Sequence, residues 1–192
     1  MQYVEKAGQN NGRNNKKGKF MKEQEYTHII HPFPPLYDAS SQILILGSLP
    51  SVKSREQMFF YGHPQNRFWK VIAAVLNEEV PVTIEEKKQM LLKHHIALWD
   101  TIYSCDIIGS SDSSIKNVVP TDLKKIIEES CITRVFCNGK TSGKYYEKYQ
   151  QKVLGVKAQV LPSTSPANAA FSLEKLIMIW DGEINSNDGK NK

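Results

Sequence analysis

The sequence is poor in cysteine and has no long apolar segment. Its three cysteines, Cys105, Cys131 and Cys137, are an odd number without C-x-x-C spacing, which argues against a disulfide framework and against a structural zinc or iron–sulfur site. No segment approaches the roughly 20 apolar residues that a membrane-spanning helix needs, and the polar N-terminus lacks the apolar core of a secretory signal. We therefore expect a cytoplasmic protein that carries no metal and no cofactor.

Most of the net charge of +5 lies near the N-terminus. Residues 1–25 contain six Lys or Arg and three Glu, a surplus of +3, and the other 167 residues have 19 basic and 17 acidic side chains, a surplus of +2. The composition predicts a disordered basic tail over residues 1–25, one globular domain over 26–184 and a frayed polar tail over 185–192. Because the domain is nearly neutral, a face that binds nucleic acid must come from local clustering of charge.

Short apolar runs alternate with helical patterns along the domain. The continuous run Ile43–Leu46 is typical of a strand buried in a parallel sheet. Further strands are predicted at Ile96–Trp99, Thr133–Cys137 and Lys157–Leu161. Helices are predicted at Asn66–Asn77, at Thr83–His94 with a Thr83–Glu86 capping box, at Thr121–Ser130 with Thr121 as N-cap, at Lys140–Lys152 and at Ala169–Ile184.

This alternation predicts an α/β fold. We expect a three-layer α/β/α sandwich with a mostly parallel central sheet of about four strands. Ligands of such sheets bind beyond the carboxyl ends of the strands. The loops of functional interest therefore follow Leu46, Trp99, Cys137 and Leu161.

The loops after the first and last predicted strands carry distinctive motifs. The first strand is followed by Gly-Ser-Leu-Pro-Ser at residues 47–51 and by Tyr-Gly-His-Pro-Gln-Asn-Arg-Phe-Trp at 61–69, and the last by Ser-Thr-Ser-Pro-Ala-Asn at 163–168. With Trp-Asp at 99–100 and Ser-Asp-Ser-Ser-Ile at 111–115, the chain resembles the uracil-DNA glycosylase superfamily. It resembles most of all the hypoxanthine (deoxyinosine) branch, which is related to the mismatch-specific G:T/U glycosylases. The resemblance covers residues 31–180.

The resemblance implies a monofunctional DNA glycosylase of base excision repair. Such an enzyme flips a deaminated base, here preferably hypoxanthine, out of DNA into a pocket and hydrolyses its N-glycosidic bond. No lysine of the motifs is a compelling Schiff-base candidate, so we expect no strand-cleaving step. The expected partner is DNA with a damaged or mispaired base, and the protein is expected to act as a monomer.

The resemblance assigns catalysis to Asn66. Many superfamily members have Asp or Asn at the third position of the first motif, but here that residue is Leu49, which can neither orient nor deprotonate water. An amide can orient water and stabilise charge, which is most of what an oxocarbenium-like transition state requires. Asn66 could equally be the N-cap of the helix that follows it. His63 is a second catalytic candidate, as an electrophile near the leaving base, or else a turn residue.

The base pocket is expected to contain Ser48, Leu49, Tyr61, Asp100 and Asn138. Tyr61 lies five residues before Asn66, where mismatch-specific relatives have a stacking aromatic, although it could also belong to the core. Asp100 could accept the N1–H of hypoxanthine, or instead cap a helix or form a salt bridge. Asn138 could read the base edge, or simply begin an Asn-Gly turn.

Two hydroxyl-rich segments are expected to contact DNA phosphates through O–H and backbone N–H groups. The first comprises Ser51, Lys53, Ser54 and Arg55. The second comprises Ser163, Thr164, Ser165, Pro166, Ala167 and Asn168, and its small residues Pro166 and Ala167 are suited to the minor groove. Ser163 stands where the uracil-specific branch has its catalytic histidine, which argues against very efficient uracil excision.

Other functions remain open at this stage. The same chemistry could act on uracil or thymine mispaired with guanine, because one sequence does not determine the shape of the pocket. A non-catalytic protein that binds nucleic acid, and that kept the fold after losing Asp or Asn at position 49, is favoured by the nearly neutral domain and opposed by Asn66, His63 and Tyr61. An unrelated small-molecule α/β enzyme is disfavoured, since the sequence has no Gly-rich phosphate loop and no nucleophile elbow.

Overall fold

A computed structural model describes residues 25–186 of the chain. The predicted basic tail, apart from residue 25, and residues 187–192 lie outside the described residues. Two residues of the predicted frayed C-terminal tail are held in place. Nδ2 of Asn185 donates to the carbonyl of Val75 at 3.0 Å, and Arg134 donates to Oγ of Ser186 at 3.3 Å. Between residues 25 and 186, no helix has both the length and the apolar character needed to cross a bilayer.

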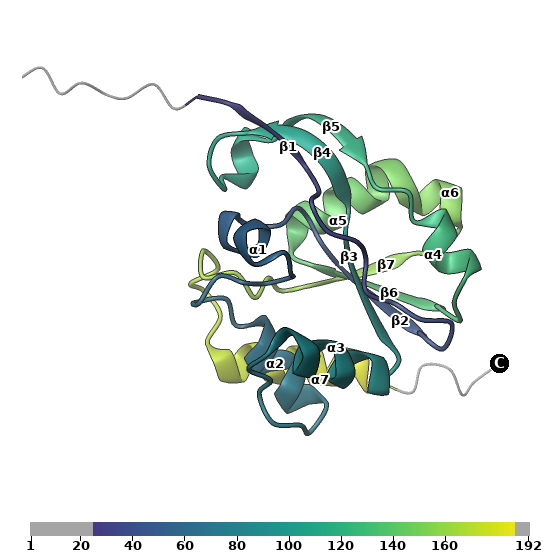
Figure 1. The fold of residues 1–192 in the computed structure, drawn as a ribbon. Coiled ribbons are helices and arrows are strands. Elements are labelled where there is room, and N and C mark those ends of the chain that lie inside the picture. The colour runs from purple at the N-terminus through teal and green to yellow at the C-terminus, as the bar shows by residue number, and fades with distance from the viewer. Residues whose placement is uncertain (1–24, 187–192) are drawn as a thin grey trace, which may run out of the picture.

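A four-stranded parallel sheet in the order β3-β2-β6-β7 forms the centre of the molecule (Figure 1). All four predicted strands are confirmed, as β2 (Ile43–Gly47), β3 (Ile96–Asp100), β6 (Arg134–Asn138) and β7 (Ala158–Leu161). Strand β2 has a parallel neighbour on each side, and Leu44, Ile45 and Leu46 have no exposed surface. Burial on both faces explains why this strand is an uninterrupted apolar run.

Helices cover both faces of this sheet, which confirms the three-layer sandwich. Figure 1 shows one group of helices on one face, comprising α2 (Phe68–Val75), α3 (Ile84–Lys93) and α7 (Leu173–Ile184). The other face carries α4 (Lys124–Glu128), α5 (Lys140–Tyr146), the π-helical turn η2 (Glu147–Gln151) and α6 (Lys152–Leu154). The short helix α1 (Val52–Gln57) lies near the carboxyl ends of the strands. The fully buried rings of Phe68 and Trp180 join α2 to α7, with centroids 5.9 Å apart.

A second sheet was not predicted. It is antiparallel, has the order β1-β4-β5, and consists of β1 (Thr27–Ile30), β4 (Ile102–Ile107) and β5 (Lys116–Pro120), with the 3-10 turn η1 (Asp112–Ser114) before β5. Only Thr101 separates β3 from β4, so the chain passes from one sheet to the other without a turn signal. The N–H of Thr101 donates to the carbonyl of Gly47 at 2.9 Å, which joins β4 to the end of β2.

The hydrogen bonds of the residues just before each helix help to determine where that helix begins. Thr83 and Glu86 form the predicted capping box of α3. Thr121 does not cap α4, contrary to prediction, because its hydroxyl donates to the carbonyl of Asp100 at 2.7 Å, and the helix is shorter than expected. Helix α7 begins later than predicted, with Ser172 as its N-cap, and residues 162–171 form a loop.

We expect Thr83→Ala to lower the free energy of unfolding by about 1 kcal/mol, because it removes one half of the capping box. Urea denaturation measures the change. Val82→Ala is the matched control, since Val82 is 81% exposed and its replacement should change stability by less than about 0.5 kcal/mol. Equal losses in the two variants would contradict a capping role for Thr83.

Candidate active site

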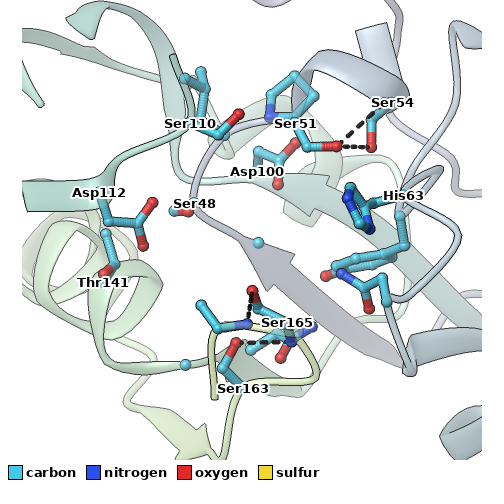
Figure 2. Close-up of a pocket in the computed structure, with 18 of the residues that line it drawn as sticks. Ser48, Ser51, Ser54, His63, Asp100, Ser110, Asp112, Thr141, Ser163 and Ser165 are labelled. Carbon is cyan, nitrogen blue, oxygen red and sulfur yellow. Dashed lines mark hydrogen bonds between the residues drawn. The ribbon is translucent and has the colours of Figure 1, made fainter. Parts of the chain in front are cut away.

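The carboxyl ends of β2, β3, β6 and β7 surround a pocket of about 390 Å³ (Figure 2). This is the edge of the sheet at which the sequence placed the functional loops. The predicted site residues that line it are Ser48, Leu49, Ser51, Lys53, Ser54, Arg55, Tyr61, His63, Asn66, Asp100, Asn138, Ser163, Ser165, Pro166 and Ala167. Two residues predicted to contact DNA, Thr164 and Asn168, do not line the pocket.

The carboxamide of Asn66 has a fixed orientation at the pocket wall. Its Oδ1 accepts hydrogen bonds from the N–H of Phe68 at 3.0 Å and from the hydroxyl of Thr164 at 2.9 Å. Arg67, rather than Asn66, has the N-cap position of α2, although Asn66 does satisfy the first N–H of the helix. Because Oδ1 is engaged twice, Nδ2 is the free end of the amide, and no residue between 25 and 186 accepts a hydrogen bond from it.

Thr164 has no exposed surface, so it is placed differently from the predicted phosphate contact. Its N–H donates to Oδ1 of Asn138 at 2.9 Å, and Nδ2 of Asn138 donates to its hydroxyl oxygen at 2.9 Å. The same hydroxyl donates to Asn66. A continuous chain of hydrogen bonds therefore runs from the end of β6 through Thr164 to the amide of Asn66.

Arg67 joins the two motif loops, a role that the sequence did not reveal. Its guanidinium donates to four backbone carbonyl oxygens of the loop after β7, those of Thr164, Ser165, Asn168 and Phe171. Its backbone N–H donates to the carbonyl of Thr164 at 3.1 Å. Hydrogen bonds to a charged donor are stronger than neutral ones, so one side chain fixes a loop that has no regular secondary structure.

Tyr61 lines the pocket with a backbone φ of +53°, in the left-handed region that bulky residues seldom adopt. One face of its ring stacks on Phe68 at a centroid distance of 3.9 Å, so only the opposite face is left for a base. Its hydroxyl is buried near Asn138 but forms no hydrogen bond of normal geometry with a described residue. Burial, and then the charge of Asp100, raises the pKa of Tyr61 far above its usual value, so the hydroxyl keeps its hydrogen.

Asp100 and the Tyr61 hydroxyl meet beside Gly47. A Cβ atom on Gly47 would lie only 2.2 Å from Oδ1 of Asp100 and 3.4 Å from the Tyr61 hydroxyl, so a larger residue would displace the carboxylate. The other carboxylate oxygen, Oδ2, lies 2.8 Å from Nε2 of the buried His31. Asp100 therefore lines the pocket and at the same time has a buried histidine as its hydrogen-bond partner.

His63 lies at the rim in a turn closed by the N–H of Asn66, which donates to its carbonyl at 2.8 Å. Nδ1 of the ring accepts a hydrogen bond from the N–H of Gln65 at 3.2 Å. A neutral ring whose Nδ1 accepts must carry its hydrogen on Nε2, so His63 can donate from that atom. Within residues 25–186, no three His, Cys, Asp or Glu side chains form a group that could hold a metal ion.

The two predicted phosphate segments differ in how free their side chains are. Ser51 caps α1, and the buried Ser54 accepts a hydrogen bond from the N–H of Gly62 at 3.0 Å, so Ser54 mainly braces the loop. Lys53 forms an exposed ion pair with Glu56 at 2.6 Å, and Arg55 donates to the carbonyl of Pro50 at 2.9 Å.

In the loop after β7, the serine hydroxyls brace the backbone but keep a hydrogen to donate. Oγ of Ser163 accepts from the N–H of Ser165 at 3.2 Å, and Oγ of Ser165 accepts from the N–H of Ala167 at 3.3 Å. Nδ2 of Asn168 donates to the carbonyl of Ser163 at 2.8 Å. Asn168 therefore stabilises the loop, while Ser163 and Ser165 face the pocket (Figure 2).

Four polar residues of the pocket, and the histidine behind it, were not among the predicted site residues. Lys140 and Thr141 follow the Asn-Gly turn after β6, and that turn was a usable signal for them. Asp112 belongs to the Ser-Asp-Ser-Ser-Ile motif at residues 111–115, which was a usable signal as well. Ser110 precedes that motif in the loop between β4 and β5, so placing it requires the second sheet. His31 had no signal, because its partner Asp100 is 69 residues away.

We expect Thr164→Val to lower the free energy of unfolding by about 1–3 kcal/mol, because it leaves the half-buried amide of Asn138 without its acceptor and removes the donor to Asn66. Thr164→Ser retains the hydroxyl and should lose at most about 1 kcal/mol, the worth of one methyl group. Urea denaturation of both variants measures the difference. A valine variant as stable as the wild type would contradict the hydrogen-bond chain.

Comparison with known proteins supports the resemblance. The model of the Uracil DNA glycosylase superfamily matches residues 34–181. A protein of Methanosarcina acetivorans named "Hypoxanthine DNA glycosylase" is 37% identical over 146 residues, which cover 75% of this chain and 91% of the relative. A protein of the same name from Methanosarcina barkeri is 32% identical over 139 residues, which cover 71% and 86% respectively.

A solved structure agrees with both fold and family. It is the solution NMR structure of a protein from Methanosarcina acetivorans that is proposed to be a uracil DNA glycosylase. The two structures superpose with a TM-score of 0.67 at 32% sequence identity, over 78% of this chain and 94% of the other. The family match spans both motif loops and nearly all of the domain, and this chain belongs to the uracil-DNA glycosylase superfamily.

Proposed function

We infer that this chain is a DNA glycosylase that removes hypoxanthine from DNA by hydrolysing its N-glycosidic bond. The observation that carries the inference is the amide of Asn66, whose Oδ1 is fixed by two hydrogen bonds and whose Nδ2 is free at the wall of the pocket. The names of the two Methanosarcina relatives support the same substrate. The base must leave the duplex to reach this site, because a stacked base hides its glycosidic bond.

Asn66 would act as a hydrogen-bond donor. Glycosidic cleavage passes through an oxocarbenium-like transition state, in which water needs positioning more than deprotonation. Nδ2 of Asn66 can donate to the water oxygen and leave a lone pair directed at C1′ of the sugar. Leu49 cannot take part in this step. Nε2 of His63 would donate a hydrogen bond to the departing base, where negative charge develops. The C1′–N bond breaks as the bond from C1′ to the water oxygen forms, and the proton that the water loses balances the one that the released base takes up.

Asp100 would read the edge of the base. Oδ1 of Asp100 is an acceptor for the N1–H of hypoxanthine. The free face of the Tyr61 ring would stack on the base, an interaction worth about 1–3 kcal/mol. Asn138 would act through Thr164 on Asn66, and Ser48 would line the pocket without a direct contact to the base edge.

The rim residues would hold the DNA backbone. Ser163 and Ser165 have hydroxyl groups on one side of the pocket and Ser51 on the other (Figure 2). Lys53 and Arg55 belong to α1, which Ser51 caps, and bring positive charge to that second side. Pro166 and Ala167 would approach the minor groove beside the vacated base position. The pocket contains a residue for each step of the proposed reaction, and we propose that the chain acts as a monomer.

The test uses labelled duplexes that contain one hypoxanthine, one uracil opposite guanine or one thymine opposite guanine, followed by alkaline cleavage of abasic sites. We expect cleavage at hypoxanthine. Asn66→Ala should lower the single-turnover rate by about 100-fold or more, the effect of removing one hydrogen-bond donor from a transition state. Gln65→Ala is the matched control, because Gln65 is the exposed neighbour and does not line the pocket.

Each other outcome is informative. Release of uracil or thymine in preference to hypoxanthine would change the substrate and retain the reaction. Base release that is unaffected by Asn66→Ala would contradict the role of Asn66. Binding of the duplex without release of any base would identify a non-catalytic protein and overturn the proposed function.

A further inference from the structure

Behind the pocket floor lies a buried histidine that the proposed mechanism does not use. The side chain of His31 has no exposed surface, and that of Asp100 is 6% exposed. Nε2 of His31 is 2.8 Å from Oδ2 of Asp100, and Nδ1 is 2.9 Å from the carbonyl oxygen of Phe33. Both ring nitrogens are therefore engaged inside the protein.

These two contacts locate the hydrogens. A carbonyl oxygen can only accept, so Nδ1 of His31 must carry a hydrogen. The short contact between Nε2 and Oδ2 then requires one more hydrogen between them, on either atom. The pair is an imidazolium with a carboxylate, or an imidazole with a carboxylic acid protonated at Oδ2. In both states the hydrogen lies between Nε2 of His31 and Oδ2 of Asp100, so Oδ1 carries no hydrogen.

Aromatic side chains surround His31. Its ring is packed against Trp99, Phe33 and Phe60, at centroid distances of 4.1, 4.6 and 6.4 Å. These edge-on and tilted contacts hold the ring in one orientation. A buried ion pair by itself adds little to stability. A role in the adjacent pocket therefore explains this pair better than a role in stability does.

The other carboxylate oxygen of Asp100 faces the pocket. Oδ1 has no hydrogen-bond partner among residues 25–186, and it is the atom that a side chain on Gly47 would meet. Figure 2 shows Asp100 beside the pocket space, between Ser48 and His63.

We propose that His31 is a positioning residue that keeps Oδ1 of Asp100 a hydrogen-bond acceptor, so that the pocket selects bases with a ring N–H. The proposal rests on the proposed function. It adds an explanation of how the pocket recognises a deaminated base. Deamination of adenine turns N1 from an acceptor into an N–H donor, and deamination of cytosine does the same to N3. A fixed acceptor therefore favours the deaminated form. Without His31, the buried carboxyl group would be free to protonate at Oδ1 and to donate to an unprotonated ring nitrogen.

The experiment compares excision of hypoxanthine with excision of unsubstituted purine, placed in the same duplex as deoxynebularine, which has no N1–H. The measured quantity is the ratio of the two kcat/KM values within each variant. A general loss of structure lowers both values and leaves the ratio unchanged. We expect His31→Phe to lower the ratio by about tenfold or more, since sites built to bind an N–H reject analogues that lack it by large factors.

Two further variants complete the test. His31→Gln retains a donor to Oδ2 of Asp100 and should preserve the ratio to within about threefold. That change is smaller than the change expected when one base-reading hydrogen bond is lost. His28→Phe removes a matched histidine, whose Nδ1 contacts Asp106 at 2.8 Å on the exposed second sheet, and should leave the ratio unchanged. An unchanged ratio in His31→Phe would overturn the proposal, whereas absence of hypoxanthine excision by the wild type would overturn the proposed function instead.

An NMR measurement on the unmodified chain keeps the proposal testable if His31→Phe does not fold. Nitrogen-15 chemical shifts of the His31 ring and the carbon-13 shift of the Asp100 carboxyl group should show a hydrogen between Nε2 and Oδ2. A ring that carries its only hydrogen on Nδ1 beside an ionised Asp100 would contradict the proposal, because no hydrogen would then join His31 to Oδ2.

Discussion

The candidate site depends on one cation that holds together two loops almost 100 residues apart. The guanidinium of Arg67 donates to four backbone carbonyl oxygens of the loop after β7. Those carbonyls belong to no helix or sheet, so they need donors from elsewhere. Because Arg67 fixes the backbone around Thr164, the Thr164 hydroxyl is held where it can donate to Asn66. The position of the Asn66 amide therefore depends on the Arg67 guanidinium, although Arg67 itself does not line the pocket.

Three polar side chains of the pocket share one arrangement, in which one end is bound by the protein and the other is free. Oδ1 of Asn66 is engaged and Nδ2 is free, Oδ2 of Asp100 is engaged and Oδ1 is free, and Nδ1 of His63 is engaged and Nε2 is free. The engaged end determines whether the free end donates or accepts. Asn66 and His63 thus present donors, and Asp100 presents an acceptor. This preset pattern suits a water, a departing base and a ring N–H.

Much of the architecture and the gathering of the motifs were predictable from sequence. Apolar runs such as Ile43–Leu46 mark the parallel strands, and the carboxyl ends of parallel strands meet at one edge, so residues as distant as Ser48 and Ser163 line one pocket. The second sheet was not predictable, because β4 continues from β3 across Thr101 without a turn. The roles of Thr164 and His31 were hidden as well, since each is defined by partners 26 to 98 residues away and local spacing has no information on such contacts.

The most direct test of the central claim is a crystal structure of the chain with a duplex that contains 2′-fluoro-2′-deoxyinosine, in which the fluorine slows cleavage by destabilising the oxocarbenium ion. We expect hypoxanthine inside the pocket on the free face of Tyr61, with N1 about 2.7–3.2 Å from Oδ1 of Asp100. We also expect a water held by Nδ2 of Asn66 on the side of C1′ opposite the base. A base that stays stacked in the duplex, or that binds with N1 directed away from Asp100, would contradict the proposed roles of both residues.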